Sequence, residues 1–144
     1  MFYNRTLYTE IARVHKRALR SVLCDFNNSY EVLLENSQCS PVHETHLSFL
    51  LCEVFKSVNN LNPKFMQEIF KPKTVSYNLR NQDLMSLPLA SSMRFGTQSF
   101  IFRGSLLWNQ VPQNIKSKPS LVSFKSALKD LNLSNICIIV KLCS

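Results

Sequence analysis

Four side chains of types that bind metals lie between residues 39 and 52: Cys39, His43, His46 and Cys52. Cysteine thiolates and histidine imidazoles are the usual ligands of structural zinc. His43 and His46 are three residues apart, so they would share one face of a helix. The run contains no paired Cys-x-x-Cys, however, and histidines are also ordinary helix residues. The sequence therefore favours no metal site here, and it indicates no other cofactor.

The chain has five scattered cysteines: Cys24, Cys39, Cys52, Cys137 and Cys143. None of them lies in a pattern of base and orienting group typical of a nucleophilic cysteine. The first twenty residues are too charged for the core of a secretion signal, and no apolar run is long enough to span a membrane. We therefore expect free, buried thiols in a protein of the nucleus or cytoplasm.

The basic residues are the second chemical signal. The formal charge is +8, and it comes from residues 71–144, where ten basic side chains face two acidic ones. Such an excess attracts polyanions, because neutralising phosphates releases counterions. It is equally typical of a solvated surface. The candidates for nucleic-acid contact are Arg13, Lys16, Arg17, Arg20, Arg94, Arg103, Lys116, Lys118, Lys125 and Lys129.

Aromatic side chains alternate with two of these arginines, Arg94 and Arg103. Such a mixture is typical of a platform on which single-stranded bases stack. Aromatics at strand spacing also fill protein cores, and we favour that interpretation. The aromatic residues concerned are Phe95, Phe100, Phe102 and Trp108.

Helices must position most of these groups. Apolar residues recur every three or four positions in residues 6–24, 41–58 and 119–131, which predicts three amphipathic helices. Shorter helices are expected at 30–35 and 63–70. On the last long helix, Lys125 and Lys129 point away from the apolar face. The three apolar faces consist of Leu7, Ile11, Val14, Ala18 and Val22; of Leu47, Leu50, Leu51, Val54, Phe55 and Val58; and of Leu121, Phe124, Ala127, Leu128 and Leu131.

Residues 71–94 lose this helical period and are expected to form an extended connector. Phe95 to Phe102 alternates between two faces and Met85 to Leu89 is β-prone, which predicts a β-hairpin or short antiparallel sheet around residues 85–102. The predicted fold class is therefore α+β, mostly helical, with three to five amphipathic helices. The chain divides by charge into a helical segment, 1–70, and a basic segment, 71–144, within one unit or a fragment. Turn or packing roles are expected for Gly96, Gly104, Trp108, Pro112 and Phe124.

Six ordered motifs cover nearly the whole chain: HKRALRSVL (15–23), YEVLLE (30–35), HETHLSFLLCEVFKSVNNLNPKFMQEIF (43–70), YNLR (77–80), RFGTQSFIFRGSLLWNQVP (94–112) and SLVSFKSALK (120–129). Together they resemble the C-terminal region of the reverse transcriptases of non-LTR retrotransposons, the LINE-type, Jockey-like RNA-directed DNA polymerases. The resemblance implies a segment that follows the polymerase core. It implies RNA or DNA and that core as partners, and no small-molecule substrate or membrane.

The resemblance also limits what the chain does alone. Polymerases of this family use paired aspartates to hold two magnesium ions, whereas this chain has only the separated Asp25, Asp83 and Asp130. We therefore expect no catalytic residues. The alternatives are a packing module or the nonfunctional remnant of a decayed mobile element.

Two departures from the family pattern concern its C-terminal half. The family turn usually has Gly-Pro where this chain has Gly104 and Ser105. The family often ends in a Cys-x-Cys-x-x-Cys cluster, of which only Cys143 is in place, since Cys137 is one position out of register. Two thiolates are too few ligands for structural zinc, so no metal is carried over.

Overall fold

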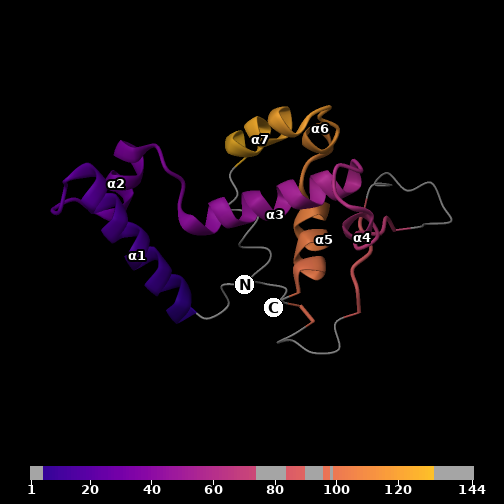
Figure 1. The fold of residues 1–144 in the computed structure, drawn as a ribbon, viewed down its shortest axis with the longest axis horizontal. Coiled ribbons are helices and arrows are strands. Elements are labelled where there is room, and N and C mark those ends of the chain that lie inside the picture. Colours follow the sequence, from indigo (N-terminus) through magenta and orange to yellow (C-terminus); the bar gives the residue numbers. More distant parts are fainter. Residues whose placement is uncertain (1–4, 74–83, 90–95, 98, 132–144) are drawn as a thin grey trace. The chain divides into compact units, whose positions relative to one another are not determined.

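The computed structural model describes residues 5–73, 84–89, 96–97 and 99–131, with only the backbone described for residues 5–8. Contacts divide the chain into two compact units, residues 1–47 and 48–144, whereas the division by charge falls between residues 70 and 71. Among the helices in the described ranges, none is both long and apolar enough to cross a lipid bilayer. The described helices are α1 Arg5–Leu23, α2 Tyr30–Ser37, α3 Val42–Val58, α4 Lys64–Gln67, α5 Phe100–Gln110, α6 Gln113–Lys116 and α7 Leu121–Asp130 (Figure 1).

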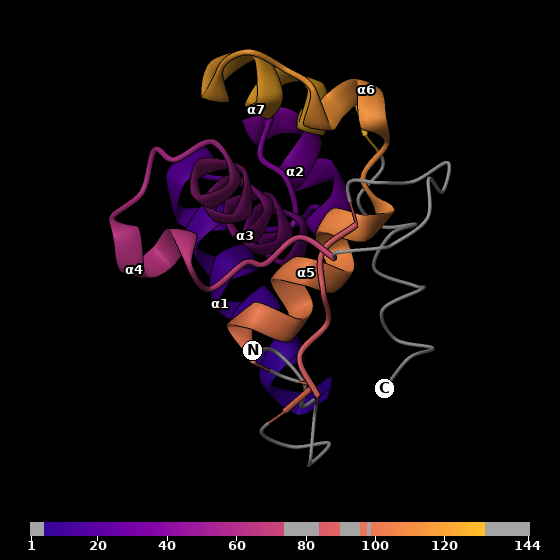
Figure 2. The same cartoon turned by 90° about the vertical axis from the view of Figure 1, so that its right-hand side faces the viewer.

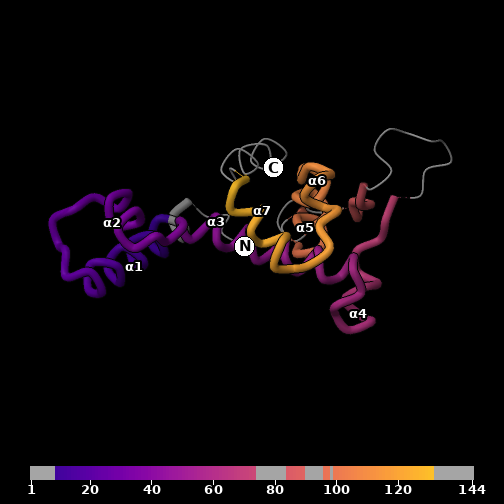
Figure 3. The backbone as a smooth tube through the Cα atoms, turned by 90° about the horizontal axis from the view of Figure 1, so that it is seen from above, coloured from indigo at the N-terminus to yellow at the C-terminus, as the bar shows by residue number. Residues whose placement is uncertain are grey.

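The first unit is built on the pairing of α1 with α2, which folds back beside α1 (Figure 3). Leu19 of α1 and Leu33 of α2 are buried. His15 Nδ1 lies 2.7 Å from the hydroxyl of Tyr30, and the two rings meet edge to face. Buried leucines and this polar contact thus help to hold the two helices together.

The turn between α1 and α2 is closed by its own polar side chains. Asp25 accepts hydrogen bonds from the backbone N–H groups of Asn27 and Asn28 and from the Asn28 side chain. These bonds, above all the one from the Asn28 side chain, lower the pKa of Asp25. Ser29 then caps α2, because its hydroxyl accepts from the N–H of Val32. Short polar residues favour such turns and caps by this mechanism.

The apolar face predicted for α1 is only partly buried. Val14 and Val22 are 65% and 77% exposed, and Ala18 between them is exposed as well. The buried position is instead Leu19, one step further around the helix. A helical pattern predicts that a face is apolar, but not that anything covers it.

The core of the second unit forms along α3. The predicted face is confirmed at Leu50, Leu51, Val54 and Phe55, which are buried, whereas Val58 at the end of the helix is exposed. In this unit α5 runs steeply across α3 (Figure 1). In the views of Figures 1 and 2, α7 lies along the side of α3.

Three aromatic rings join α3, α5 and α7. Phe55 stacks on Phe124 with ring centroids 4.3 Å apart. Trp108 lies 6.5 Å from Phe55 and 6.0 Å from Phe124. Trp108 is only 3% exposed and Phe124 is fully buried, so this triad is the hydrophobic centre of the unit.

The predicted β-hairpin is wrong. Residues from Phe100 onward form α5, and residues 71–73 and 84–89 contribute only one isolated antiparallel bridge, between Pro72 and Met85. Met85 to Leu89 is therefore no strand, while residues 90–95 lie outside the described part. Within the described residues the fold is helical, not α+β.

Helical packing explains the error at Phe100 and Phe102. The hydroxyl of Ser99 accepts a hydrogen bond from the N–H of Phe102 and so caps α5. Aromatic residues fit strands only where the surrounding packing suits them, and here the helical face decides. The buried residues of that face recur at helical spacing: Gly104, Ser105, Leu107 and Trp108.

Gly104 lies inside α5 and not in a turn. A Cβ at this position would be 2.8 Å from Cε1 of Phe70 and 3.0 Å from Cγ2 of Val54. A side chain here would therefore require the Phe70 ring to shift. Gly96 lies in a turn just before α5.

Candidate nucleic-acid interface

The basic residues around α6 and α7 lie on helices that are held in place by buried side chains and a helix cap. Pro112 precedes α6 as its N-cap residue, and Ile115 of this short helix is buried. Ser120 caps α7 by accepting a hydrogen bond from the N–H of Ser123. Phe124 and Leu128, one turn apart, bury the inner face of α7. The outer face of α7 is thereby fixed in direction.

Lys125 and Lys129 occupy that outer face. Each directly follows a buried residue, so each points away from the core, and both are exposed as the sequence predicts. The two are four residues apart and therefore neighbours on the helix surface. The acidic Asp130 lies next to Lys129 and is also exposed. The pair is thus available to a ligand from solution.

Lys116 adds a third charge near this surface. Its Nζ lies 5.7 Å from the centroid of the Trp108 ring, within the range of a cation–π interaction. Lys118 follows in the loop to α7 and is half-buried. We call these four residues the α6–α7 basic cluster: Lys116, Lys118, Lys125 and Lys129.

The other predicted contacts belong elsewhere. Arg103 is a half-buried residue of α5, and Arg94 lies outside the described residues. Helix α1 carries the remaining four in the first compact unit. There Arg13 and Arg17 are exposed, whereas Lys16 and Arg20 are half-buried. The ten candidates are therefore divided between the two units.

Of the described aromatic residues in this group, only Phe100 is exposed. Trp108 is buried in the aromatic triad, and Phe102 is half-buried. Phe100 packs edge to face on Phe70, with the centroids 5.5 Å apart. Phe95 lies outside the described residues. For Trp108 the core interpretation is confirmed.

The cysteine and histidine run spans the boundary between the two units, with Cys39, His43 and His46 in the first and Cys52 in the second. Across the ranges that the structure describes, no three histidine, cysteine or acidic side chains come together in a way that could hold a metal. Burial lowers the pKa of His46, so the imidazole favours its neutral form.

The thiols differ from the expectation of uniform burial. Cys24 and Cys39 are free and exposed, whereas Cys52 is free and buried. Burial raises the pKa of the Cys52 thiol. The prediction of buried thiols is therefore wrong for two of these three, and Cys137 and Cys143 lie outside the described residues.

Two asparagines that sequence reasoning passed over have clear structural roles. Asn109 Oδ1 accepts from the N–H of Met85 at 2.6 Å, and its Nδ2 donates to the Met85 carbonyl at 3.1 Å. The Asn109 amide thus makes the two backbone hydrogen bonds that a neighbouring strand would otherwise make to Met85. It fixes the position of Met85, which is buried. The Trp-Asn dipeptide was the available signal, but the bond partner is 24 residues away.

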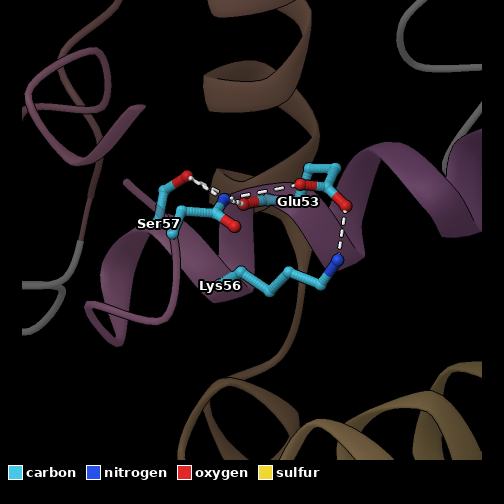
Figure 4. Close-up of polar contacts among 4 residues, drawn as sticks. Glu53, Lys56 and Ser57 are labelled. Atoms are coloured by element: carbon cyan, nitrogen blue, oxygen red, sulfur yellow. Dashed lines mark hydrogen bonds and ion pairs between the residues drawn. The ribbon is translucent and has the colours of Figure 1, made fainter. Parts of the chain in front are cut away.

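Asn62 closes the end of α3 in a similar way. Its Nδ2 donates to Ser57 Oγ at 3.0 Å and to both the carbonyl and the carboxylate of Glu53 (Figure 4). The same carboxylate pairs with Lys56, whose Nζ lies 2.6 Å from Oε1. Lys56 thus has an ion-pair partner within the protein, whereas Lys125 and Lys129 are exposed.

Comparison with known proteins finds no matching protein-family model, no matching curated protein and no matching solved structure.

Proposed function

We propose that this chain is an accessory segment from the region after the polymerase core of a non-LTR retrotransposon reverse transcriptase. In this proposal it holds RNA or DNA through the α6–α7 basic cluster and does no polymerisation itself. The observation that carries nucleic-acid binding is the exposed pair Lys125 and Lys129 on a helix whose other face is buried. The six ordered motifs support the parent family.

The charge distribution supports this choice of surface. The second unit, residues 48–144, has twelve basic and four acidic side chains, whereas residues 1–47 have five of each. A phosphate backbone is held by such an excess largely without regard to base sequence. Accordingly, we expect binding to RNA and DNA alike, in the nucleus or cytoplasm, with no metal or cofactor required.

A packing role beside the polymerase core is the second candidate. It is favoured by large apolar side chains on the surface of the second unit, such as Phe49, which is 64% exposed, and Phe65, which is 66% exposed. Exposed apolar patches mark surfaces that contact other proteins, or cause aggregation when the partner is missing.

The test is binding of the intact chain to a labelled RNA–DNA hybrid and to single-stranded RNA across a salt series. The variant is Lys125→Ala with Lys129→Ala, which leaves Lys116 in place over Trp108. The matched control is Arg13→Ala with Arg17→Ala, another exposed pair four residues apart. Each lost phosphate contact reduces the slope of log affinity against log salt by about 1, so we expect a reduction of about 2 for the lysine variant only.

Three results would overturn the proposal. Equal slopes for the lysine variant and the unaltered chain would remove the cluster from the interface. A chain that unfolds cooperatively but binds neither nucleic acid would be the packing module. A chain without a cooperative transition would fit the nonfunctional remnant.

A further inference from the structure

Helix α1 carries three parallel rows of residues spaced four apart. The rows are successive in sequence, so each lies about 100° around the helix from the next. The first row is basic, with exposed Arg13 and Arg17, and the second is apolar. The third faces α2. The rows are Arg13, Arg17 and Ser21; Val14, Ala18 and Val22; and His15, Leu19 and Leu23.

In the described part of the first unit, the third row contacts α2. His15 contacts Tyr30 of α2, and Leu19 is buried. The second row stays open, with Val14 65% and Val22 77% exposed. Three apolar residues at this spacing form the stripe that an amphipathic helix needs in order to pack along a second helix. The small Ala18 at its middle permits a close approach of another backbone.

The charges beside the stripe select among possible occupants. Residues 48–144 of this chain are strongly basic, so they complement Arg13 and Arg17 poorly. A second copy of α1 would bring its own basic row to the same interface. Phosphate groups would be attracted to the arginines, but they would make no favourable contact with the valines. An apolar helix bordered by carboxylates satisfies both rows.

We propose that the row Val14, Ala18 and Val22 is a docking surface for an acidic amphipathic helix of a partner protein. The valines take the apolar face of that helix, and Arg13 and Arg17 pair with carboxylates along its border. Glu10 lies four residues before Val14, at the start of the same row. Its carboxylate repels other carboxylates, so the acidic residues of the partner lie beside Arg13 and Arg17 and not beside Glu10. This surface is separate from the α6–α7 basic cluster and does not depend on nucleic-acid binding.

The probes are two synthetic helical peptides with the same leucine stripe, one bordered by glutamate and the other by lysine. Binding to the intact chain is measured by fluorescence anisotropy. We expect the glutamate peptide to bind about tenfold tighter than the lysine peptide, and Arg13→Glu with Arg17→Glu to reverse that order. Val14→Ser with Val22→Ser should weaken binding of the glutamate peptide about tenfold.

Two controls separate the stripe from general effects. Val122→Ser alters a valine of α7 that is 79% exposed, and it should leave peptide binding unchanged. Lys125→Ala with Lys129→Ala should also leave it unchanged, which keeps the result independent of the nucleic-acid proposal. Far-ultraviolet circular dichroism and thermal unfolding show whether each variant is folded.

Several outcomes would overturn the docking surface. Unchanged peptide binding in the Val14 and Val22 variant would do so, as would a peptide preference that Arg13→Glu with Arg17→Glu does not alter. A large loss of stability in the valine variant would show that the chain itself covers the stripe. Sedimentation that reveals a dimer lost in the valine variant would identify a second copy as the occupant.

Discussion

Helices α1 and α7 carry the same basic signal but use their apolar residues differently. Each has two exposed basic residues four apart, Arg13 and Arg17 in α1, Lys125 and Lys129 in α7. In α7 the residues preceding each lysine are buried in the aromatic core. In α1 the residues following each arginine are the exposed Val14 and Ala18.

A basic pair alone therefore does not define a ligand. In α7, where the residues before the lysines are buried, the exposed surface carries charge and the lone valine Val122 but no apolar stripe, which suits a polyanion. Beside an open apolar stripe, as in α1, it offers charge and hydrophobic area together, which suits a protein helix. The neighbouring rows, and not the basic residues, distinguish the two regions.

The largest effects should come from removing core side chains in each unit. Phe124→Ala removes the ring that stacks on Phe55 and should cost about 3–5 kcal/mol of unfolding free energy. Leu33→Ala, in the first unit, should cost about 2–5 kcal/mol. Hydrogen exchange followed by mass spectrometry would show faster exchange in α5 and α7 for the first variant, and in α1 and α2 for the second. Equal acceleration everywhere in both variants would show that the two units unfold as one.

A smaller loss is expected for Gly104→Ala. In a helix interior, alanine is normally more stable than glycine by about 1 kcal/mol. At position 104, however, the Cβ of alanine would press on Phe70 and Val54. We expect a net destabilisation of about 1–3 kcal/mol, measured by denaturant unfolding. Ser126→Ala, at an exposed position of α7, is the control and should change little. A Gly104→Ala variant as stable as the parent would show that the Phe70 ring moves aside.

The two units can be compared again through matched helix caps. Ser29 caps α2 in the first unit, and Ser120 caps α7 in the second. Replacing either with alanine should cost about 1 kcal/mol in its own unit, as read by segment-resolved hydrogen exchange. Ser29→Asp and Ser120→Asp should restore most of the loss, since aspartate also caps helices. No rescue by aspartate would mean that the alanine effect is not a capping effect.

The smallest expected effect is a difference in thiol reactivity between the two units, which requires no change in stability. Cys24 and Cys39 of the first unit are exposed, whereas Cys52 of the second is buried and its pKa is raised. A raised pKa leaves less thiolate at a given pH, and burial also blocks access. Iodoacetamide should therefore alkylate Cys24 and Cys39 before Cys52, with the Cys52 rate rising at higher pH. Peptide mass spectrometry measures the three rates, and a Cys52 that reacts as fast as the other two would contradict the expected order.

Sequence reasoning predicted the elements better than their environment. The helices around Leu50 to Phe55 and around Phe124 to Leu128 follow from apolar spacing, and their buried faces are confirmed. The outward direction of Lys125 and Lys129 follows from the same spacing. The region around Phe100 was mispredicted as a strand, because alternating aromatics fit a short strand and a helix equally well until their neighbours are known.

Residue order alone sets the helical periods, the basic excess of the second half and the lack of paired aspartates. The packing of the helices then fixes which apolar rows are covered, places Phe70 and Val54 against Gly104, and lets Asn109 hold Met85. These depend on contacts between residues far apart in the chain, such as Phe55 with Phe124. Local spacing cannot specify such contacts, because the geometry that forms them exists only after the helices pack.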